Sequence, residues 1–349
     1  MIAPTLDRQA LARRYDLAPS PETAARMQDA YARMRRVVTP FDWAIHAPYV
    51  EAINRLKAER RAVILAHNYM TPEIYHGVAD VVGDSLQLAI RASEVDAEVI
   101  VQCGVHFMAE TSKILNPGKT VLIPDREAGC SLAESVTPAD IEAMRARHPG
   151  APVVTYVNTS AEVKAVSDVC CTSSNAAQIV AAMESETVIM APDKHLARNV
   201  AKQVPHKRIV WLDGACVVHE RFTADDLRLF REGRPDALII AHPECPTDVV
   251  DAADFAGSTS GIIDFVRRER PKEAMLVTEC SMASNISDEL PEVEFVGPCN
   301  MCPYMKTITL EKILWSLHAM EGAVEVDPEI AEKARLPIER MIALSRPKG

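Results

Sequence analysis

The stretch AVILAHNY at residues 62–69 is an apolar run that ends in polar side chains. It resembles VVTYVNT at residues 153–159 and LIIAHPE at residues 238–244, which show the same order of apolar and polar residues. Apolar runs of this length that alternate with helix-like stretches are typical of buried parallel strands. The pattern therefore predicts an α/β protein.

Two further landmarks accompany each of these runs. About a dozen residues later come ADVVGDS (79–85), SDVCCTS (167–173) and ADFAGST (253–259), whose aspartates lie 88 and 86 residues apart. A short apolar run followed by a cysteine then closes each segment, and these cysteines lie 86 and 86 residues apart: Cys130, Cys216 and Cys302. Three landmarks with one period indicate an internal repeat. We predict three homologous three-layer α/β/α domains with short parallel sheets around a pseudo-threefold axis.

The period also sets the predicted domain limits. Residues 45–130, 131–216 and 217–302 form repeat domains 1, 2 and 3. Residues 1–44 are predicted to be an N-terminal helical extension. Residues 303–349 also have helical periodicity and are expected to pack back on domain 1.

The composition excludes several classes of protein. With 38 basic and 49 acidic residues the net charge is −11, which disfavours a surface for nucleic acid or an anionic membrane. A hydrophobic content of 48% excludes a disordered chain, and no apolar run approaches the roughly 18 residues of a membrane span. We expect a soluble cytoplasmic protein, in which metal ligation or catalysis is a better default for the nine cysteines than disulfides.

The three periodic cysteines predict a metal centre. Ligands of open α/β sheets collect at the carboxyl ends of strands, so a threefold arrangement would make Cys130, Cys216 and Cys302 neighbours. Buried inert thiols are the plain alternative, and a three-thiolate zinc site is possible but less usual. Three thiolates also suit a four-iron cluster with one open iron, which can act as a Lewis acid in dehydration. In the motif CNMC we take Cys302 as the ligand and Cys299 as its neighbour, and we interpret Cys103, Cys245 and Cys280 as structural.

Hydroxyl groups precede three stretches with helical apolar spacing. They are Ser85, Ser173, Ser258 and Thr259. Free N–H groups at helix starts bind carboxylates and phosphates, so the repeated loops predict binding of a small polyanion. Each hydroxyl taken alone could equally be a plain N-cap.

Acid–base groups follow the first strand of each repeat or the second cysteine. The histidines are His67, His219 and His242, and beside them stand Tyr69, Tyr156, Asn158 and Glu244. Imidazole, phenol, carboxylate and amide groups around one cavity are what general acid–base catalysis requires.

Eight motifs together resemble the A-type quinolinate synthases of NAD biosynthesis, over roughly residues 45–345. The motifs are LAHNY (65–69), VGDSLQLA (82–89), PDREAGC (124–130), YVN (156–158), CTSSNA (171–176), CVVH (216–219), HPEC (242–245) and GST (257–259). Two positions depart from the family pattern. Met70 stands where a glutamine often follows, and Met305 replaces a third terminal cysteine, so a thiol switch built on three cysteines is not expected.

The resemblance implies a three-domain fold and an oxygen-sensitive [4Fe-4S] cluster on the same three cysteines. It also implies condensation of iminoaspartate with dihydroxyacetone phosphate to quinolinate, phosphate and water, with iminoaspartate supplied by an L-aspartate oxidase or aspartate dehydrogenase. The implied substrate-binding residues are His67, Ser85, Tyr156, Asn158, Ser173, His242, Glu244, Ser258 and Thr259. The implied catalytic residues are Glu244, His67, Tyr69, Tyr156, His219 and His242.

Glu244 is predicted to be the principal acid–base residue, with its pKa tuned toward neutrality by desolvation beside His242. His67, His219 and His242 would orient substrate or act as secondary proton groups. An iron–sulfur redox sensor without catalysis and a zinc-dependent lyase remain the alternatives.

Overall fold

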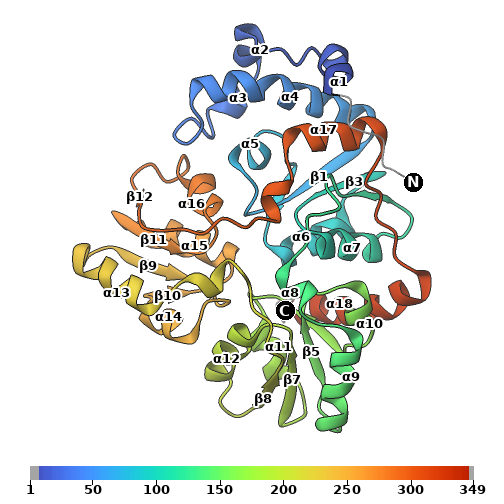
Figure 1. Cartoon of the computed structure of the whole chain (residues 1–349), viewed down its shortest axis with the longest axis vertical. Helices are drawn as coiled ribbons and strands as arrows, with labels where there is room; N and C mark the ends of the chain where they lie inside the picture. The colour runs from blue at the N-terminus through green and yellow to red at the C-terminus, as the bar shows by residue number, and fades with distance from the viewer. Residues whose placement is uncertain (1–7, 346–349) are drawn as a thin grey trace.

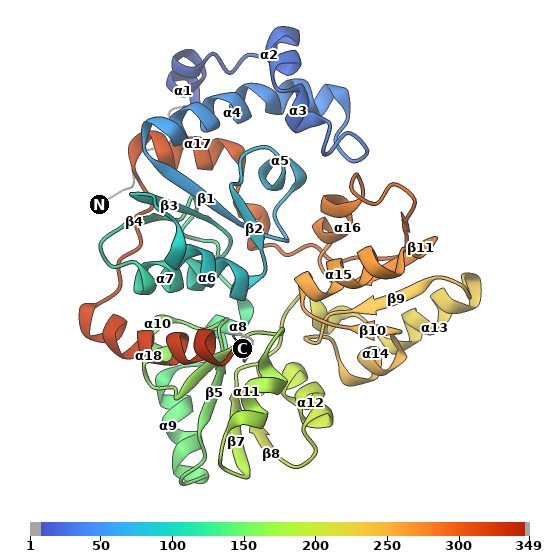
Figure 2. The ribbon, with the colours of Figure 1, turned by 180° about the vertical axis from the view of Figure 1, so that it is seen from behind.

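Three parallel sheets surround the centre of the molecule in the computed structural model, which describes residues 8–345 (Figure 1). Each sheet has four strands, in the orders β2-β1-β3-β4, β6-β5-β7-β8 and β10-β9-β11-β12. The strand order is therefore the same in all three repeats, with helices packed beside each sheet (Figure 2). The predicted α/β fold with three repeated units is confirmed.

The elements of the three units follow the same sequence. The first unit contains β1 (Ala62–His67), α5 (Pro72–Tyr75), β2 (Val81–Gly83), α6 (Ser85–Glu94), β3 (Val99–Cys103), α7 (His106–Leu115) and β4 (Thr120–Leu122). The second contains α8 (Ser131–Glu134), α9 (Pro138–Arg147), β5 (Val153–Tyr156), α10 (Ala161–Ala165), β6 (Val169–Cys171), α11 (Ala176–Ala182), β7 (Thr187–Ala191), α12 (Lys194–Gln203) and β8 (Arg208–Trp211). The third contains η1 (His219–Arg221), α13 (Ala224–Gly233), β9 (Leu238–Ala241), α14 (Thr247–Ala252), β10 (Phe255–Ala256), α15 (Thr259–Glu269), β11 (Glu273–Val277), α16 (Ser281–Ile286) and β12 (Glu294–Phe295).

The central strands form because their residues are apolar on both faces. In β1, for example, Ile64, Leu65 and Ala66 are fully buried, as expected for a parallel sheet covered by helices on both sides. Where the apolar residues of a strand give way to a histidine or tyrosine, the strand reaches the edge of the core. The polar residues that follow β1, β5 and β9 therefore leave their sheets at matching points.

Helices from both ends of the chain cover the outside of the repeats. They are α1 (Arg8–Tyr15), α2 (Pro21–Arg26), α3 (Gln28–Tyr31), α4 (Pro40–Glu59), η2 (Met305–Thr307), α17 (Leu310–Ala319) and α18 (Pro328–Ser345). No helix within residues 8–345 is long and apolar enough to cross a bilayer.

Both predicted flanks are helical, but their limits differ from the expectation. The N-terminal extension was expected to end at residue 44, whereas α4 runs across that limit, and residues 1–7 lie outside the described part. Helix α17 packs on α4 beside the first unit, and helix α18 packs mainly on α10 and β6 of the second unit. The domain limits at 130 and 216 stay a prediction.

Candidate active site

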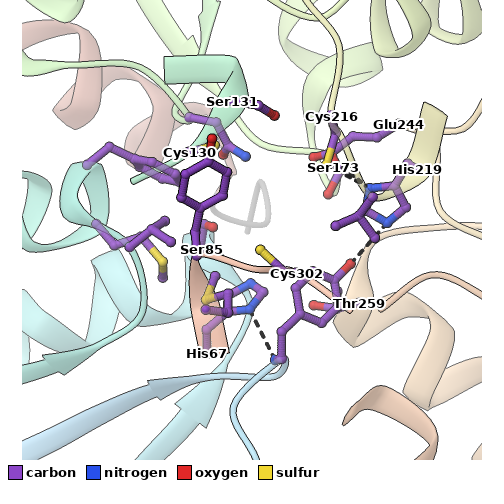
Figure 3. Close-up of a pocket in the computed structure, with 18 of the residues that line it drawn as sticks. His67, Ser85, Cys130, Ser131, Ser173, Cys216, His219, Glu244, Thr259 and Cys302 are labelled. Carbon is purple, nitrogen blue, oxygen red and sulfur yellow. Dashed lines mark hydrogen bonds and ion pairs between the residues drawn. The ribbon is translucent and has the colours of Figure 1, made fainter. Parts of the chain in front are cut away.

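A cavity of about 70 Å³ lies where the three units meet (Figure 3). Twelve of its lining residues form four sets of three, one residue from each repeat. The hydroxyl set is Ser85, Ser173 and Thr259, and the ring set is His67, Tyr156 and His242. The third set is Tyr69, Asn158 and Glu244, and the thiol set is Cys130, Cys216 and Cys302.

Strand register explains why the members of each set meet. Ala66 of β1 pairs with Cys103 of β3, and the same rung in the other sheets joins Thr155 to Ala191 and Ala241 to Val277. The ring set follows this rung by one residue and the third set by three. The carboxyl ends of parallel strands thus point to one place, which is where ligands collect in open α/β sheets.

Two members of the hydroxyl set lie at the start of the helices that follow the second strands, and Ser173 lies in the loop before α11. Ser85 and Thr259 are the first residues of α6 and α15. The preceding residues Asp84 and Ser258 are the N-caps, accepting from the amides of Gln87 and Gly261. Capping by the preceding residue leaves the next hydroxyl free to face the cavity.

Ser258 was predicted to bind substrate, but the structure does not place it on the central cavity. Its hydroxyl caps α15 and lies 3.4 Å from Oδ2 of Asp84. It lines a neighbouring hollow of about 590 Å³, which Asp84 and Ser173 also border. The reason is register, because Ser258 stands one residue before the hydroxyl equivalent to Ser85.

His67 and His242 have matching local structures. Nδ1 of each ring accepts a hydrogen bond from the backbone amide two residues later, over 3.2 Å from Tyr69 and 3.4 Å from Glu244. The proton of each neutral ring is therefore on Nε2. Burial lowers the pKa of His67 to about 4 and that of His242 to about 3, despite the nearby Glu244 carboxylate. Both rings are thus neutral hydrogen-bond donors at physiological pH.

Glu244 is bound through both of its carboxylate oxygens. Its Oε1 accepts from the phenol of Tyr156, and its Oε2 lies 2.8 Å from Nδ1 of His219. Burial favours the neutral carboxyl, but the adjacent imidazoles of His242 and His219 and the hydrogen bonds from His219 and Tyr156 outweigh it and lower the pKa of Glu244. The expectation of a pKa near neutrality is therefore wrong. Glu244 is an ionised acceptor, because His242 beside it in the chain, His219 and Tyr156 together overcome the effect of desolvation.

A continuous hydrogen-bonded chain connects Glu244 to Tyr69. Nε2 of His219 lies 2.9 Å from Oγ1 of Thr278, which lies 2.6 Å from the phenol oxygen of Tyr69. Burial, reinforced by Glu244, raises the pKa of both Tyr69 and Tyr156, so both remain protonated phenols. Thr278, which sequence reasoning missed, is the middle member of this chain.

The three thiols approach the cavity from loops that follow the fourth strands, Cys302 lying just before η2 (Figure 3). Among the described residues, one group of three potential metal ligands has all its ligand atoms within 4.8 Å of one another: Cys216, His219 and Glu244. Cys130, Cys216 and Cys302 together do not form such a group. One zinc ion with bonds of about 2.3 Å needs closer sulfurs. Three soft thiolates spread around a cavity fit a larger metal–sulfur group.

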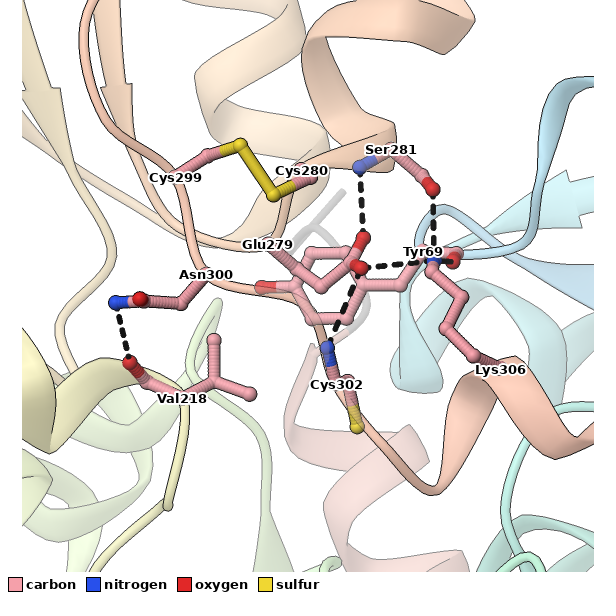
Figure 4. Close-up of a disulfide and its surroundings, with 9 residues drawn as sticks. All are labelled: Tyr69, Val218, Glu279, Cys280, Ser281, Cys299, Asn300, Cys302 and Lys306. Carbon is pink, nitrogen blue, oxygen red and sulfur yellow. Dashed lines mark hydrogen bonds and ion pairs between the residues drawn. A yellow bond between two sulfur atoms is a disulfide. The ribbon is translucent and has the colours of Figure 1, made fainter.

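A buried ion pair holds the Cys302 loop (Figure 4). Nζ of Lys306 lies 2.7 Å from Oε1 of Glu279 and donates to the carbonyl of Tyr69 over 2.8 Å. The same Oε1 accepts from the amide of Cys302 over 3.4 Å. Sequence reasoning missed Glu279 and Lys306, although Glu279 repeats Asp193 after 86 residues, a spacing that could have revealed it.

Cys280 and Cys299 form a disulfide beside this ion pair (Figure 4). The expectation that the cysteines avoid disulfides is therefore wrong for this pair. The loops after β11 and β12 run side by side through a bridge between Glu279 and Asn300, which brings the two cysteines to a Cα separation of 5.0 Å. Cys103 and Cys245 are buried free thiols.

The two departures from the family pattern lie in different places. Met305 lines the central cavity near Cys302, whereas Met70 is fully buried and is not part of the lining. Met70 therefore packs in the core rather than setting the polarity of the cavity surface.

Comparisons with known proteins identify the family of this chain. The family model described as quinolinate synthetase A protein matches residues 51–343. A quinolinate synthase of Sinorhizobium fredii is 59% identical over 333 residues, covering 95% of this chain and 92% of the relative. Quinolinate synthase 1 of Mesorhizobium japonicum is 57% identical (89% and 96% covered), and the quinolinate synthase of Caulobacter vibrioides is 54% identical (94% and 90% covered). The chain belongs to the quinolinate synthetase A family, as its sequence motifs predicted.

Proposed function

We propose that this enzyme condenses iminoaspartate with dihydroxyacetone phosphate and releases quinolinate, phosphate and water. The observation that carries the proposal is that four sets of repeat-equivalent residues line one cavity. Three hydroxyls, two neutral imidazoles and an amide can bind a dicarboxylate and a phosphate, while the carboxylate and phenols can move protons. Family membership supports the same activity.

The proposed cofactor is a [4Fe-4S] cluster held by Cys130, Cys216 and Cys302. Such a cluster, when bound, supplies an open iron that can act as a Lewis acid toward a leaving hydroxyl. The half-buried thiols border the same cavity as Glu244 and Tyr156, so a substrate bound there would reach both.

Substrate anions would be bound mainly by neutral donors. The Nε2–H groups of His67 and His242 and the hydroxyls of Ser85, Ser173 and Thr259 border the cavity. Neutral donors bind carboxylates without adding positive charge to the site, and positive charge would hold back the anionic product. Oδ1 of Asn158 has no hydrogen-bond partner among the residues described, so it is free to accept from an amino or hydroxyl group of the substrate.

Glu244 is the proposed acid–base residue. As an ionised carboxylate between Tyr156 and His219 it can take a proton from a substrate carbon or hydroxyl. Tyr156 and the chain of His219, Thr278 and Tyr69 hold the carboxyl group in place, so that the same group can return the proton to the substrate in a later step. His67 and His242 would orient the substrate.

The supply of iminoaspartate and the location of the protein complete the proposal. Iminoaspartate would come from an oxidase or dehydrogenase acting on L-aspartate, because its imine requires a two-electron oxidation of the amine. We propose a cytoplasmic location, since substrates with several negative charges do not cross membranes unaided.

Metal analysis of anaerobically purified protein tests the proposal. We expect about four iron and four sulfide per chain, as a four-iron cluster requires. Replacing Cys130, Cys216 or Cys302 by Ser should remove them, whereas Cys103→Ser should not. Stoichiometric zinc would favour the zinc-dependent lyase instead. A full cluster without quinolinate formation from the two substrates would favour the redox sensor.

A further inference from the structure

Two buried asparagines join neighbouring units at the strand ends that carry Glu244 and Tyr69. Nδ2 of Asn199, in α12, donates to the carbonyls of Pro243 and Cys245 over 2.9 and 3.0 Å. Nδ2 of Asn285, in α16, donates to the carbonyls of Asn68 and Met70 over 3.0 and 2.8 Å. Each asparagine therefore binds the carbonyls of the two residues on either side of one cavity residue.

The two asparagines are equivalent in the repeat. They lie 86 residues apart on corresponding helices, and each is 3% exposed. Each reaches from its own unit into the next, Asn199 from the second unit to the third and Asn285 from the third to the first. The amide nitrogen has two hydrogens, and both are used on carbonyl groups. We call each such pair of bonds an asparagine clamp.

In the part of the chain that the structure describes, the interface between the first and second units has no asparagine clamp. The equivalent position of α7 is Thr111, because the amides of His106 and Lys194 make the same contact to Ala128 and Gly214 in their repeats. The Thr111 hydroxyl donates to the carbonyl of Phe107 within its own helix, over 2.8 Å. Within residues 8–345, no asparagine clamp therefore holds the carbonyls on either side of Asn158, and the carbonyl of Thr159 instead accepts from Nζ of Lys164 in its own unit. Glu110 of α7 still joins the two units by accepting from the amide of Ala161 over 3.1 Å, so a bond that merely joins domains does not require this asparagine.

The clamps coincide with the residues that would move protons. Glu244 and Tyr69 are the two ends of the chain through His219 and Thr278, and each lies between two clamped carbonyls. We propose that Asn199 and Asn285 are positioning residues, which fix the backbone under Glu244 and Tyr69 so that their side chains meet the substrate in a reactive geometry. This inference rests on the proposed roles of Glu244 and Tyr69.

The physical reason is precision. A loop at a strand end would otherwise hold its cavity residue through one backbone connection, and a misplacement of about 1 Å can lower a rate by about 100-fold. Both clamps are built on helices, which place groups more precisely than loops do. Removal of the donors should therefore lower turnover more than substrate affinity.

Leucine variants test the clamp because leucine has the size of asparagine but no donor. We expect Asn199→Leu and Asn285→Leu to lower kcat by about 10- to 100-fold with less than a threefold change in KM, while iron content is kept. Asn199→Ser, which keeps one donor, should fall between the parent and Asn199→Leu. Asn54→Leu is the matched control, since Asn54 donates to a single carbonyl, that of Gly77, away from the cavity; it should leave kcat unchanged.

A double-mutant cycle separates positioning from general stability. Because Asn199 acts through Glu244, Asn199→Leu should cost little further kcat in a Glu244→Gln background, and the same should hold for Asn285→Leu in a Tyr69→Phe background. Losses that multiply in both backgrounds would overturn the proposal. Loss of folding or iron in both Asn199→Leu and Asn199→Ser would also overturn it in favour of a structural role. Parental turnover of Glu244→Gln would instead overturn the proposed role of Glu244, and the Tyr69 arm would still decide the clamp.

Discussion

Glu244 and Asn158 occupy the same position in two repeats but have different surroundings. Glu244 is bound on both oxygens by Tyr156 and His219, and the carbonyls of the residues on either side of it are clamped by Asn199. Oδ1 of Asn158 finds no partner in the described residues, and the carbonyl of Thr159 beside it is bound by Lys164 of its own unit rather than by an asparagine of the neighbouring unit. Both side chains nevertheless border the same cavity.

The difference shows how a symmetric scaffold acquires separate roles. A buried carboxylate must be compensated by donors, so the Glu244 position is surrounded by groups from other strand ends. A neutral amide can remain partly unpaired until a ligand arrives. The repeat supplies three equal places, and their neighbours determine whether a place moves protons or binds substrate.

The largest expected effect is on Glu244. Glu244→Gln keeps the size and one acceptor but loses the proton-accepting carboxylate, so kcat should fall by about 10²–10⁴-fold with iron content unchanged. Steady-state quinolinate formation measures it. Glu220→Gln, at an acid bound to Lys194 outside the cavity, should retain turnover. Near-parental turnover of Glu244→Gln would place the base elsewhere, at His219 or Tyr69.

The second prediction compares His67 with Tyr156, its counterpart in the ring set. The pKa of His67 is about 4 in the fold and 6.5 ordinarily, so below pH 6.5 the unfolded chain binds the proton that the folded chain refuses. Above pH 6.5 this difference in proton binding does not affect the free energy of unfolding. As the pH falls from 6.5 toward 4, the free energy of unfolding decreases. At pH 5 the loss is about 2 kcal/mol.

Urea unfolding of the parent and His67→Gln at pH 7.5 and pH 5.0 measures this contribution. The parent should lose about 2 kcal/mol more than the variant on acidification. Tyr156→Phe, at the position without an imidazole, should follow the parent. Equal losses in the parent and His67→Gln would show that His67 protonates freely in the fold.

A smaller effect is expected at Asn158, because it loses one ligand contact rather than a proton-transfer group. Asn158→Ala should weaken quinolinate binding by about 1–2 kcal/mol and leave thermal stability nearly unchanged. Calorimetric titration of the anaerobic enzyme with quinolinate checks this. An unchanged affinity would mean that the free amide oxygen does not meet the ligand, and the contrast with Glu244 would lose its functional meaning.

The smallest effect separates two adjacent hydroxyls. Ser258→Ala should lower stability by about 1 kcal/mol through loss of the N-cap, with little change in ligand affinity. Thr259→Ala should weaken phosphate or dicarboxylate binding, because its hydroxyl borders the cavity. Calorimetry and thermal unfolding of both variants distinguish the two roles. Equal loss of affinity in both would return Ser258 to the substrate site.

Much of this molecule could be predicted from the sequence because its information is local and repeated. Apolar strands ending in polar residues, and cysteines at 86-residue spacings, predicted the α/β fold and its threefold repetition. The same patterns selected Cys130, Cys216 and Cys302, and every ring and third-set residue that the structure brings to the cavity. Strand ends can be recognised in a sequence because they depend on residues that are neighbours in the chain. The repeat period can be recognised because equivalent residues recur at a fixed spacing.

The remaining features depend on contacts between segments far apart in the chain. The pKa of Glu244 is lowered by His219 and Tyr156 as well as by the nearby His242, and Thr278, Lys306 and the two clamping asparagines matter only through partners in another unit or loop. Whether Ser258 or Thr259 faces the cavity depends on which of the two is the N-cap and which is the first residue of α15. The sequence by itself determined the repeats and which residues gather at their centre. Only the tertiary structure decided their protonation, their orientation and their supports, because these depend on the distance and burial of groups that the chain brings together by folding.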